Sequence, residues 1–147
     1  RFLAGEIVEV HAFPAKGFNK DVPSNYNIED ASVVNLKFKN GAVGNLWASC
    51  SANAGGGGVS LRVYANETTA IFEGWEHNLR LLRTDREPEQ IPGEPNIFRI
   101  EDNAFIDAVR LKDPSKILST YPDALQTLKV TLAANESMKS GKPVRVS

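Results

Sequence analysis

Cysteine is nearly absent from this sequence. Cys50 is the single cysteine among 147 residues, so an internal disulfide bond is excluded. Proteins without disulfides are typical of reducing compartments, which predicts a cytoplasmic location. The sequence also lacks an uninterrupted apolar run long enough to span a bilayer. Disulfide-stabilised scaffolds and membrane-spanning proteins are therefore not expected.

The chain also lacks an excess of charge of either sign. Seventeen Lys and Arg residues stand against eighteen Asp and Glu, which gives a net charge of -1. Nucleic-acid-binding and anionic-membrane-binding proteins need a clustered basic face, so neither partner is expected. The hydrophobic content of 41% and the charged content of 24% are those of an ordinary globular protein. The length predicts one domain over residues 1–147.

A third absence concerns chemistry. His11, His77 and Cys50 do not have the spacing of a metal site, and no Ser/His/Asp or Cys/His nucleophile set is present. The glycine run in residues 54–58 suggests a phosphate loop, but it leads into a strand pattern and no lysine follows it. A flexible loop between strands is the better interpretation. We therefore expect no catalytic, cofactor-binding or metal-binding residues in this chain.

Alternating apolar residues predict an antiparallel β-structure through most of the chain. Asn40 and Gly41 supply the positions of a tight hairpin turn, and a second hairpin is expected to turn near Asn66 and Glu67. The expected strands cover residues 6–13, 34–39, 42–52, 78–84 and 142–146, together with the two arms of the second hairpin within residues 59–74. Residues 14–30 and the proline-bearing segment 85–96 are expected to be loops.

The periodicity changes to that of helices near residue 100. One helix is expected from about residue 100 to 111, and a second from about 121 to 140, ending at Gly141. We expect Leu125, Leu128, Leu132 and Met138 to face the core. The predicted fold class is α+β, with an open, mainly antiparallel sheet of about six strands and helices on one face.

The other face of the predicted sheet mixes polar and aromatic side chains. We expect it to carry Glu9, His11, Asn35, Lys37, Trp47, Ser49, Arg62 and Tyr64. Aromatic residues among Arg and Ser are more typical of an interface than of a bare surface. Burial by a second subunit is therefore predicted, with His11, Lys37, Trp47, Arg62 and Tyr64 as interface residues. A solvated face is the alternative.

The order of these segments resembles the C-terminal domain of the Gfo/Idh/MocA family, which is dihydrodipicolinate-reductase-like. The strongest pieces are the hairpin "DASVVNLKFKNGAVG" in residues 30–44 and the ending "AANESMKSGKPV" in residues 133–144. The resemblance implies an NAD(P)-dependent oxidoreductase acting on a sugar or polyol. It also implies an N-terminal Rossmann domain, outside this sequence, that holds the cofactor and the catalytic lysine. The segment "RFLAGEIVEV" then corresponds to a position just after the active-site helix.

The family resemblance also suggests where a substrate would touch this chain. It implies contacts from the loop of residues 51–58 and from the start of the helix near Phe98, so Asn53, Phe98 and Arg99 are the candidates. Several polyol dehydrogenases carry a hydroxylated aromatic at the position of Phe98. Because phenylalanine cannot donate a hydrogen bond, a myo-inositol-like substrate is not expected.

We therefore expect the substrate-binding and subunit-interface domain of a sugar or polyol oxidoreductase. The isolated chain is predicted to be inactive and to bind no NAD or NADP, and to form a homo-oligomer through its open sheet face. Two alternatives stay open at this point. One is a non-catalytic protein that assembles through that face, and the other is a small-ligand-binding domain with the glycine loop as a lid.

Overall fold

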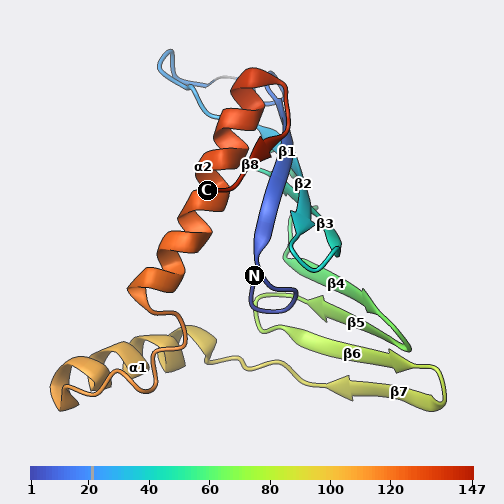
Figure 1. Ribbon diagram of the computed structural model, residues 1–147, viewed down its shortest axis with the longest axis vertical. Coiled ribbons are helices and arrows are strands. Elements are labelled where there is room, and N and C mark those ends of the chain that lie inside the picture. Colours follow the sequence, from blue (N-terminus) through green and yellow to red (C-terminus); the bar gives the residue numbers. More distant parts are fainter. Residues whose placement is uncertain (21) are drawn as a thin grey trace. The chain divides into compact units, whose positions relative to one another are not determined.

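The computed structural model describes residues 1–20 and 22–147, and it divides into two units. The helix–sheet unit comprises residues 1–53 and 119–147, and the meander unit comprises residues 54–118. The elements are antiparallel strands and two helices (Figure 1), so the predicted α+β class is confirmed. The strands form two sheets of four rather than the expected single sheet of about six.

The helix–sheet unit contains four antiparallel strands in the order β3-β2-β1-β8. Their bounds are Ile7–Ala15 for β1, Ala31–Phe38 for β2, Val43–Ser49 for β3 and Val144–Arg145 for β8. The predicted hairpin at Asn40 and Gly41 is confirmed. Gly41 has a φ of 92°, and the Asn40 side chain accepts a hydrogen bond from the Ala42 N–H at 3.0 Å.

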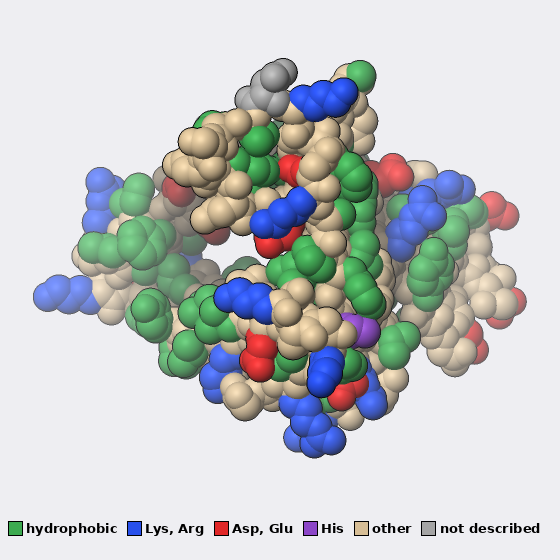
Figure 2. Space-filling model, turned by 90° about the horizontal axis from the view of Figure 1, so that it is seen from above, with side chains coloured by type: hydrophobic (Ala, Val, Ile, Leu, Met, Phe, Trp, Pro, Cys, Tyr) green, Lys and Arg blue, Asp and Glu red, His purple; other side chains and the backbone are tan. Residues whose placement is uncertain are grey.

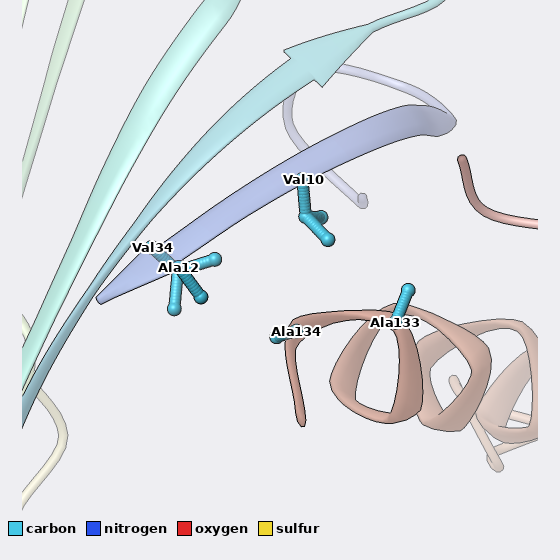
Figure 3. Packing of buried hydrophobic residues seen from close by; sticks show 5 residues of the cluster. All are labelled: Val10, Ala12, Val34, Ala133 and Ala134. Atoms are coloured by element: carbon cyan, nitrogen blue, oxygen red, sulfur yellow. The ribbon is translucent and has the colours of Figure 1, made fainter. Parts of the chain in front are cut away.

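Helix α2 (Tyr121–Ser140) packs on β1 and β8. It begins at Thr120, whose hydroxyl accepts from the Asp123 N–H, and ends at Gly141 in the left-handed conformation, as the sequence predicted. The core is small and lies between one face of the sheet and this helix (Figure 3). Its buried apolar members are Val10, Ala12, Val34, Ala133 and Ala134.

The predicted inward face of α2 is partly wrong. Met138 packs against the core as expected, but Leu125, Leu128 and Leu132 are about half exposed. The helix instead presents Ala133, Ala134 and Ser137 to the sheet. Small side chains let the helix approach the strand closely. The prediction was wrong because it rested on hydrophobicity alone, which favours the larger leucines.

The meander unit contains strands β4 (Ser60–Ala65), β5 (Thr68–Glu73), β6 (Asn78–Arg83) and β7 (Arg86–Ile91), paired in that order. Helix α1 (Ile97–Leu111) follows them. Strand β7 corrects the prediction of a loop over residues 85–96. Pro88 fits because β7 is an edge strand and because the register shifts between Leu81 and Arg83, which leaves this proline outside the ladder.

Hydrophobic side chains gather at several places on the surface (Figure 2). Within the described residues, the meander unit has no buried side chain, and α1 has none on any of its faces. In the part of the chain that the structure describes, no helix is long and apolar enough to cross a membrane.

Candidate functional site

Three of the predicted interface residues lie together on the face of the sheet that α2 does not cover. The register aligns Glu9 with Lys37, His11 with Asn35 and Asn45, and Phe13 with Val33 and Trp47. Aligned residues share a face, and the pleat repeats every two residues. His11, Lys37 and Trp47 therefore belong to one surface, which we call the open face and define by the residues Glu9, His11, Phe13, Val33, Asn35, Lys37, Val43, Asn45 and Trp47.

The centre of the open face is polar and incompletely satisfied. Asn45 donates a hydrogen bond to Asn35 at 2.9 Å, while the His11 ring packs on Phe13 with centroids 4.4 Å apart. The Nε2 atom of His11 is buried and has no hydrogen-bond partner among the described residues. His11, Asn35 and Asn45 border a shallow concavity of about 610 Å³. A buried polar atom without a partner is costly, so this position favours a group supplied from outside.

One end of the open face is aromatic. Phe13 and Trp47 flank Val33 in one row across three strands, and they are 51% and 67% exposed. Large aromatic side chains are enriched in protein interfaces because they remove much apolar area from water at a small entropic cost. Together with the unsatisfied His11, this row makes the open face a candidate contact surface.

The other two predicted interface residues belong to the meander unit. Arg62 pairs with Ile71 and Tyr64 with Thr69, so both lie on one face of that sheet, together with Arg80. Arg62, Tyr64 and Arg80 are exposed.

The predicted substrate residues are divided between the two units. Asn53 is exposed and is the last residue of the first segment of the helix–sheet unit. Phe98 and Arg99 lie in the first turn of α1 in the meander unit, and both are exposed. Phe98 and Arg99 lie together because they are consecutive in the sequence.

The sequence analysis missed a second aromatic residue beside Phe98. Trp75, in the turn between β5 and β6, lies with its ring centroid 6.4 Å from that of Phe98, and the planes are tilted by 48°. Both rings are more than half exposed. Their separation in the sequence does not predict this contact, because the turn between β5 and β6 brings the two rings close.

The turn is held by a tight backbone approach at Gly93. The Gly93 N–H donates to the Asn78 side chain at 3.0 Å, and the Glu94 N–H donates to the Glu76 carbonyl at 2.9 Å. A Cβ atom at position 93 would clash with that carbonyl oxygen. Glycine is thus required where the segment before α1 crosses the turn that carries Trp75.

A second polar cluster surrounds Asp30, which is 1% exposed. Its carboxylate accepts hydrogen bonds from the Phe18 N–H, the Asn19 amide and the Tyr26 hydroxyl, each at 2.8 Å. Burial alone would raise the pKa of Asp30, but these donors stabilise the carboxylate and lower that pKa to about 2. The cluster fixes the described part of the loop 16–29 to the sheet.

Tyr26 links this cluster to the single cysteine. Its hydroxyl lies 3.4 Å from the Cys50 sulfur and donates to Asp30. The hydrogen bond with Cys50, and then the one with Asp30, raise the pKa of Tyr26 to about 12. Cys50 is exposed and takes part in the hydrogen bonds that follow the end of β3.

Neither the glycine run nor the start of α2 has the features that hold the phosphates of a dinucleotide. The glycine run forms a turn with positive φ at Ala54 and Gly55, and it leads into β4 rather than into a helix. The first turn of α2 carries an acidic residue, Asp123, which would repel a pyrophosphate. Among residues 1–20 and 22–147, no three His, Cys, Asp or Glu side chains come close enough to hold a metal ion.

Solved structures share this fold over the whole chain. Levoglucosan dehydrogenase in complex with NADH superposes with a TM-score of 0.80 at 18% identity, covering 100% of this chain and 46% of that chain. The NAD binding oxidoreductase from Klebsiella pneumoniae gives 0.78 at 22% identity, covering 99% and 46%. The WlbA dehydrogenase from Bordetella pertussis in complex with NADH and UDP-GlcNAcA gives 0.67 at 20% identity, covering 99% and 41%.

The chain therefore spans less than half the length of these solved relatives. Its fold is that of an α+β domain that occurs within longer oxidoreductase chains. No curated protein matches its sequence. Residues 1–71 match the family model described as the GFO/IDH/MocA C-terminal domain. This match covers just under half of the chain, and it agrees with the resemblance that the sequence motifs indicated.

Proposed function

We propose that this chain is the substrate-binding and subunit-contact domain of an NAD(P)-dependent oxidoreductase that acts on a sugar or polyol. The observation that supports this most directly is the likeness in fold, over the whole chain, to levoglucosan dehydrogenase, which has been solved with NADH and levoglucosan and with NADH and L-sorbose. The parent enzyme would carry its cofactor on an N-terminal Rossmann domain. The chain alone would be inactive.

The chemistry of alcohol oxidation determines which proposed roles belong to each domain. Hydride transfer needs a bound nicotinamide, and the proton of the alcohol needs a general acid–base group. Within the described residues, neither the glycine run nor the start of α2 suits the phosphates of a dinucleotide. In the proposed enzyme both groups belong to the N-terminal domain, and this chain supplies part of the wall that orients the sugar.

The aromatic pair of Trp75 and Phe98 is the proposed apolar part of that wall. The faces of aromatic rings carry partial negative charge, which suits the polarised C–H bonds on one side of a sugar ring. Arg99 follows Phe98 in the same turn and would donate hydrogen bonds to hydroxyl groups, with Asn53 as a further candidate. This arrangement favours a ring-shaped polyhydroxylated substrate.

The open face is the proposed contact with a second copy of the chain. Its aromatic row, the unsatisfied His11 Nε2 and the concavity support this role. Glu9 and Lys37 are aligned across β1 and β2, so the face carries both signs of charge and can complement itself in a twofold pair. We include Arg62 and Tyr64 in the proposed subunit contact because they line the polar face of the meander sheet.

The test measures NAD(P)-linked oxidation of a panel of sugars and polyols by the whole gene-encoded protein and by the 147-residue chain. We expect turnover by the former with at least one sugar and no turnover by the latter.

Phe98→Ala and Trp75→Ala should raise KM about tenfold and change kcat by less than about threefold, because a stacking surface binds substrate and transition state alike. Phe18→Ala, which removes an exposed ring elsewhere, is the control. Turnover by the 147-residue chain, or none by the whole protein, would contradict the proposal.

A further inference from the structure

The open face consists of three rows of side chains that cross β1, β2 and β3. Each row holds one residue from each strand, in aligned positions. The rows are a charged row of Glu9, Lys37 and Val43, a polar row of His11, Asn35 and Asn45, and an aromatic row of Phe13, Val33 and Trp47. Arg145 of β8 is aligned with Glu9 and extends the charged row.

Glu9 and Lys37 are neighbours in the charged row, but they do not pair with each other. In the described part of the chain, the ion pairs involve other side chains. Lys37 is exposed and Glu9 is partly exposed. Both charges are therefore available to a partner.

The positions of these two charges make the face complementary to itself. Glu9 and Lys37 lie on the two middle strands of the order β3-β2-β1-β8. A twofold axis that runs along the strands between β1 and β2 lays β1 on β2 of a second copy, and β8 on its β3. All four strands then take part, which is the largest overlap that this sheet allows. Aligned sheets pack about 10 Å apart, a distance that a glutamate and a lysine side chain bridge together.

This axis places each row of the open face on the same row of the second copy. Glu9 meets Lys37 of the partner subunit, and symmetry produces the pair twice. His11 lies over Asn35 of the partner subunit, and an amide has both a donor and an acceptor for the unpaired Nε2. The aromatic rows meet each other, so apolar area covers apolar area.

Other twofold arrangements of the same face match it less well. An axis across the strands reverses the order of the rows and buries Glu9 against Phe13 of the partner subunit. A charge that loses its water without gaining a counter-charge is strongly unfavourable. An axis along β2 itself brings the two Lys37 side chains together and leaves β8 outside the contact.

An apolar element of the same chain is the alternative occupant of the open face. Helix α1 carries exposed apolar side chains, among them Phe105 and Val109. Contact with such side chains would take Glu9 and Lys37 out of water without a counter-charge. A second copy supplies the counter-charge for each of them from the same face. Charge complementarity therefore favours a second copy.

We infer that two copies of the chain pair about a twofold axis between β1 and β2, with Glu9 of each subunit paired to Lys37 of the other. This rests on the proposed function, in which the open face is the contact with a second copy. The charged row then fixes the register of the two sheets, because opposite charges meet only in this arrangement.

The test exchanges the two charges between subunits of the whole gene-encoded protein. Glu9→Lys and Lys37→Glu should each raise the dissociation constant of the pair at least about tenfold, because each creates two pairs of like charges. A mixture of the two variants should associate within about threefold of the native protein, because every charge again meets its opposite. Sedimentation with one variant fluorescently labelled measures these constants.

Glu136→Lys and Lys139→Glu are the matched controls. They make the same changes of charge at exposed positions of α2, which does not cover the open face, and they should change association less than about threefold, alone or mixed. A mixture as weak as the single variants would overturn the inference, as would variants that associate like the native protein. Variants that lose stability without dissociating would also overturn it, since the face would then be covered within one chain.

Failure of this inference is distinguishable from failure of the proposed contact. If Trp47→Lys weakens association while the mixed charge variants do not recover it, the inference fails and the proposed contact stands. A whole protein that stays monomeric at every concentration counts against both.

Discussion

The hydroxyl of Ser137 accepts a hydrogen bond from the backbone N–H of Ala12 at 2.9 Å, and it joins α2 to the middle of β1 across 125 residues of sequence. The same hydroxyl donates to the carbonyl of Lys142 at 2.6 Å. Ser137 is fully buried. One side chain therefore satisfies a strand amide and a carbonyl beyond the end of the helix, where water does not reach.

Removal of this hydroxyl should be costly. Ser137→Ala leaves the buried Ala12 N–H and the part-buried Lys142 carbonyl without this partner, and we expect it to lower the free energy of unfolding by about 2 kcal/mol. Ser140→Ala removes an exposed hydroxyl from the same helix and should change stability by less than about 0.5 kcal/mol. Urea denaturation of the two variants measures both values, and equal stabilities would contradict the role given to Ser137.

The Asp30 cluster predicts a loss of stability in acid. The pKa of Asp30 is about 2 in the folded protein and 3.8 in the absence of its partners. A lowered pKa contributes stability that is present above pH 3.8 and is lost as the pH falls through 2. Asp30→Asn should lower the melting temperature at pH 7 and flatten its dependence on pH between about 4 and 2. Thermal denaturation at several pH values tests this, and an unchanged acid slope would contradict it.

Tyr26 predicts a corresponding loss in alkali. Its pKa of about 12 lies above the ordinary value of 10.0, so the neutral phenol is favoured in the fold. The stability it contributes is present below pH 10 and is lost as the pH rises through 12. Tyr26→Phe should remove this loss. In a titration followed by tyrosinate absorbance, the native protein should show a component that titrates late, and the variant should lack it. A variant with the native alkaline profile would show that Tyr26 titrates normally.

Gly93 predicts a steric effect in the meander unit. Gly93→Ala places a Cβ against the Glu76 carbonyl oxygen, so the crossing between the turn and the segment before α1 must open. We expect a destabilisation of about 2 kcal/mol or more and a changed Trp fluorescence, since Trp75 lies in that turn. Gly58→Ala is the matched control, because a Cβ there meets nothing within 4 Å. Equal stability and equal fluorescence of the two variants would contradict the close approach of Gly93 to the Glu76 carbonyl.

The open face predicts self-association that depends on Trp47. Trp47→Lys replaces a 67% exposed aromatic side chain and should weaken the proposed pair at least about tenfold while the far-ultraviolet circular dichroism stays unchanged. Tyr121→Lys, which replaces an exposed aromatic side chain at the start of α2, is the control and should leave association unchanged. Analytical ultracentrifugation of the 147-residue chain gives the dissociation constants. A monomeric native chain, or equal effects of both substitutions, would contradict the prediction.

Local patterns in the sequence predicted most of the elements. The Asn40–Gly41 turn, the cap residues of α2 and the alternation in β1 act within a few residues, so the sequence displays them directly. Strand β7 was missed because Pro88 argues against a ladder, and the bulge that accommodates it depends on β6. The division into two sheets depends on which strands are neighbours, and periodicity does not carry that information.

The candidate site was predicted less completely, for a similar reason. The alternation placed His11, Lys37 and Trp47 on one face correctly, because strand register preserves it. Trp75 was missed because its neighbour Phe98 is distant in sequence. Leu125, Leu128 and Leu132 were wrongly assigned to the core, because hydrophobicity alone does not show which face of a helix packs on the sheet.

The proline-bearing bulge of β7 also decides how sheets can add to one another. Pro88 and the charged residues around it close that edge of the meander sheet to further strands, whereas β4 at the opposite edge has no proline. A proline and charged side chains on an edge strand hinder the addition of a further strand. The β7 edge of the meander sheet is therefore protected against edge-to-edge aggregation by its own sequence.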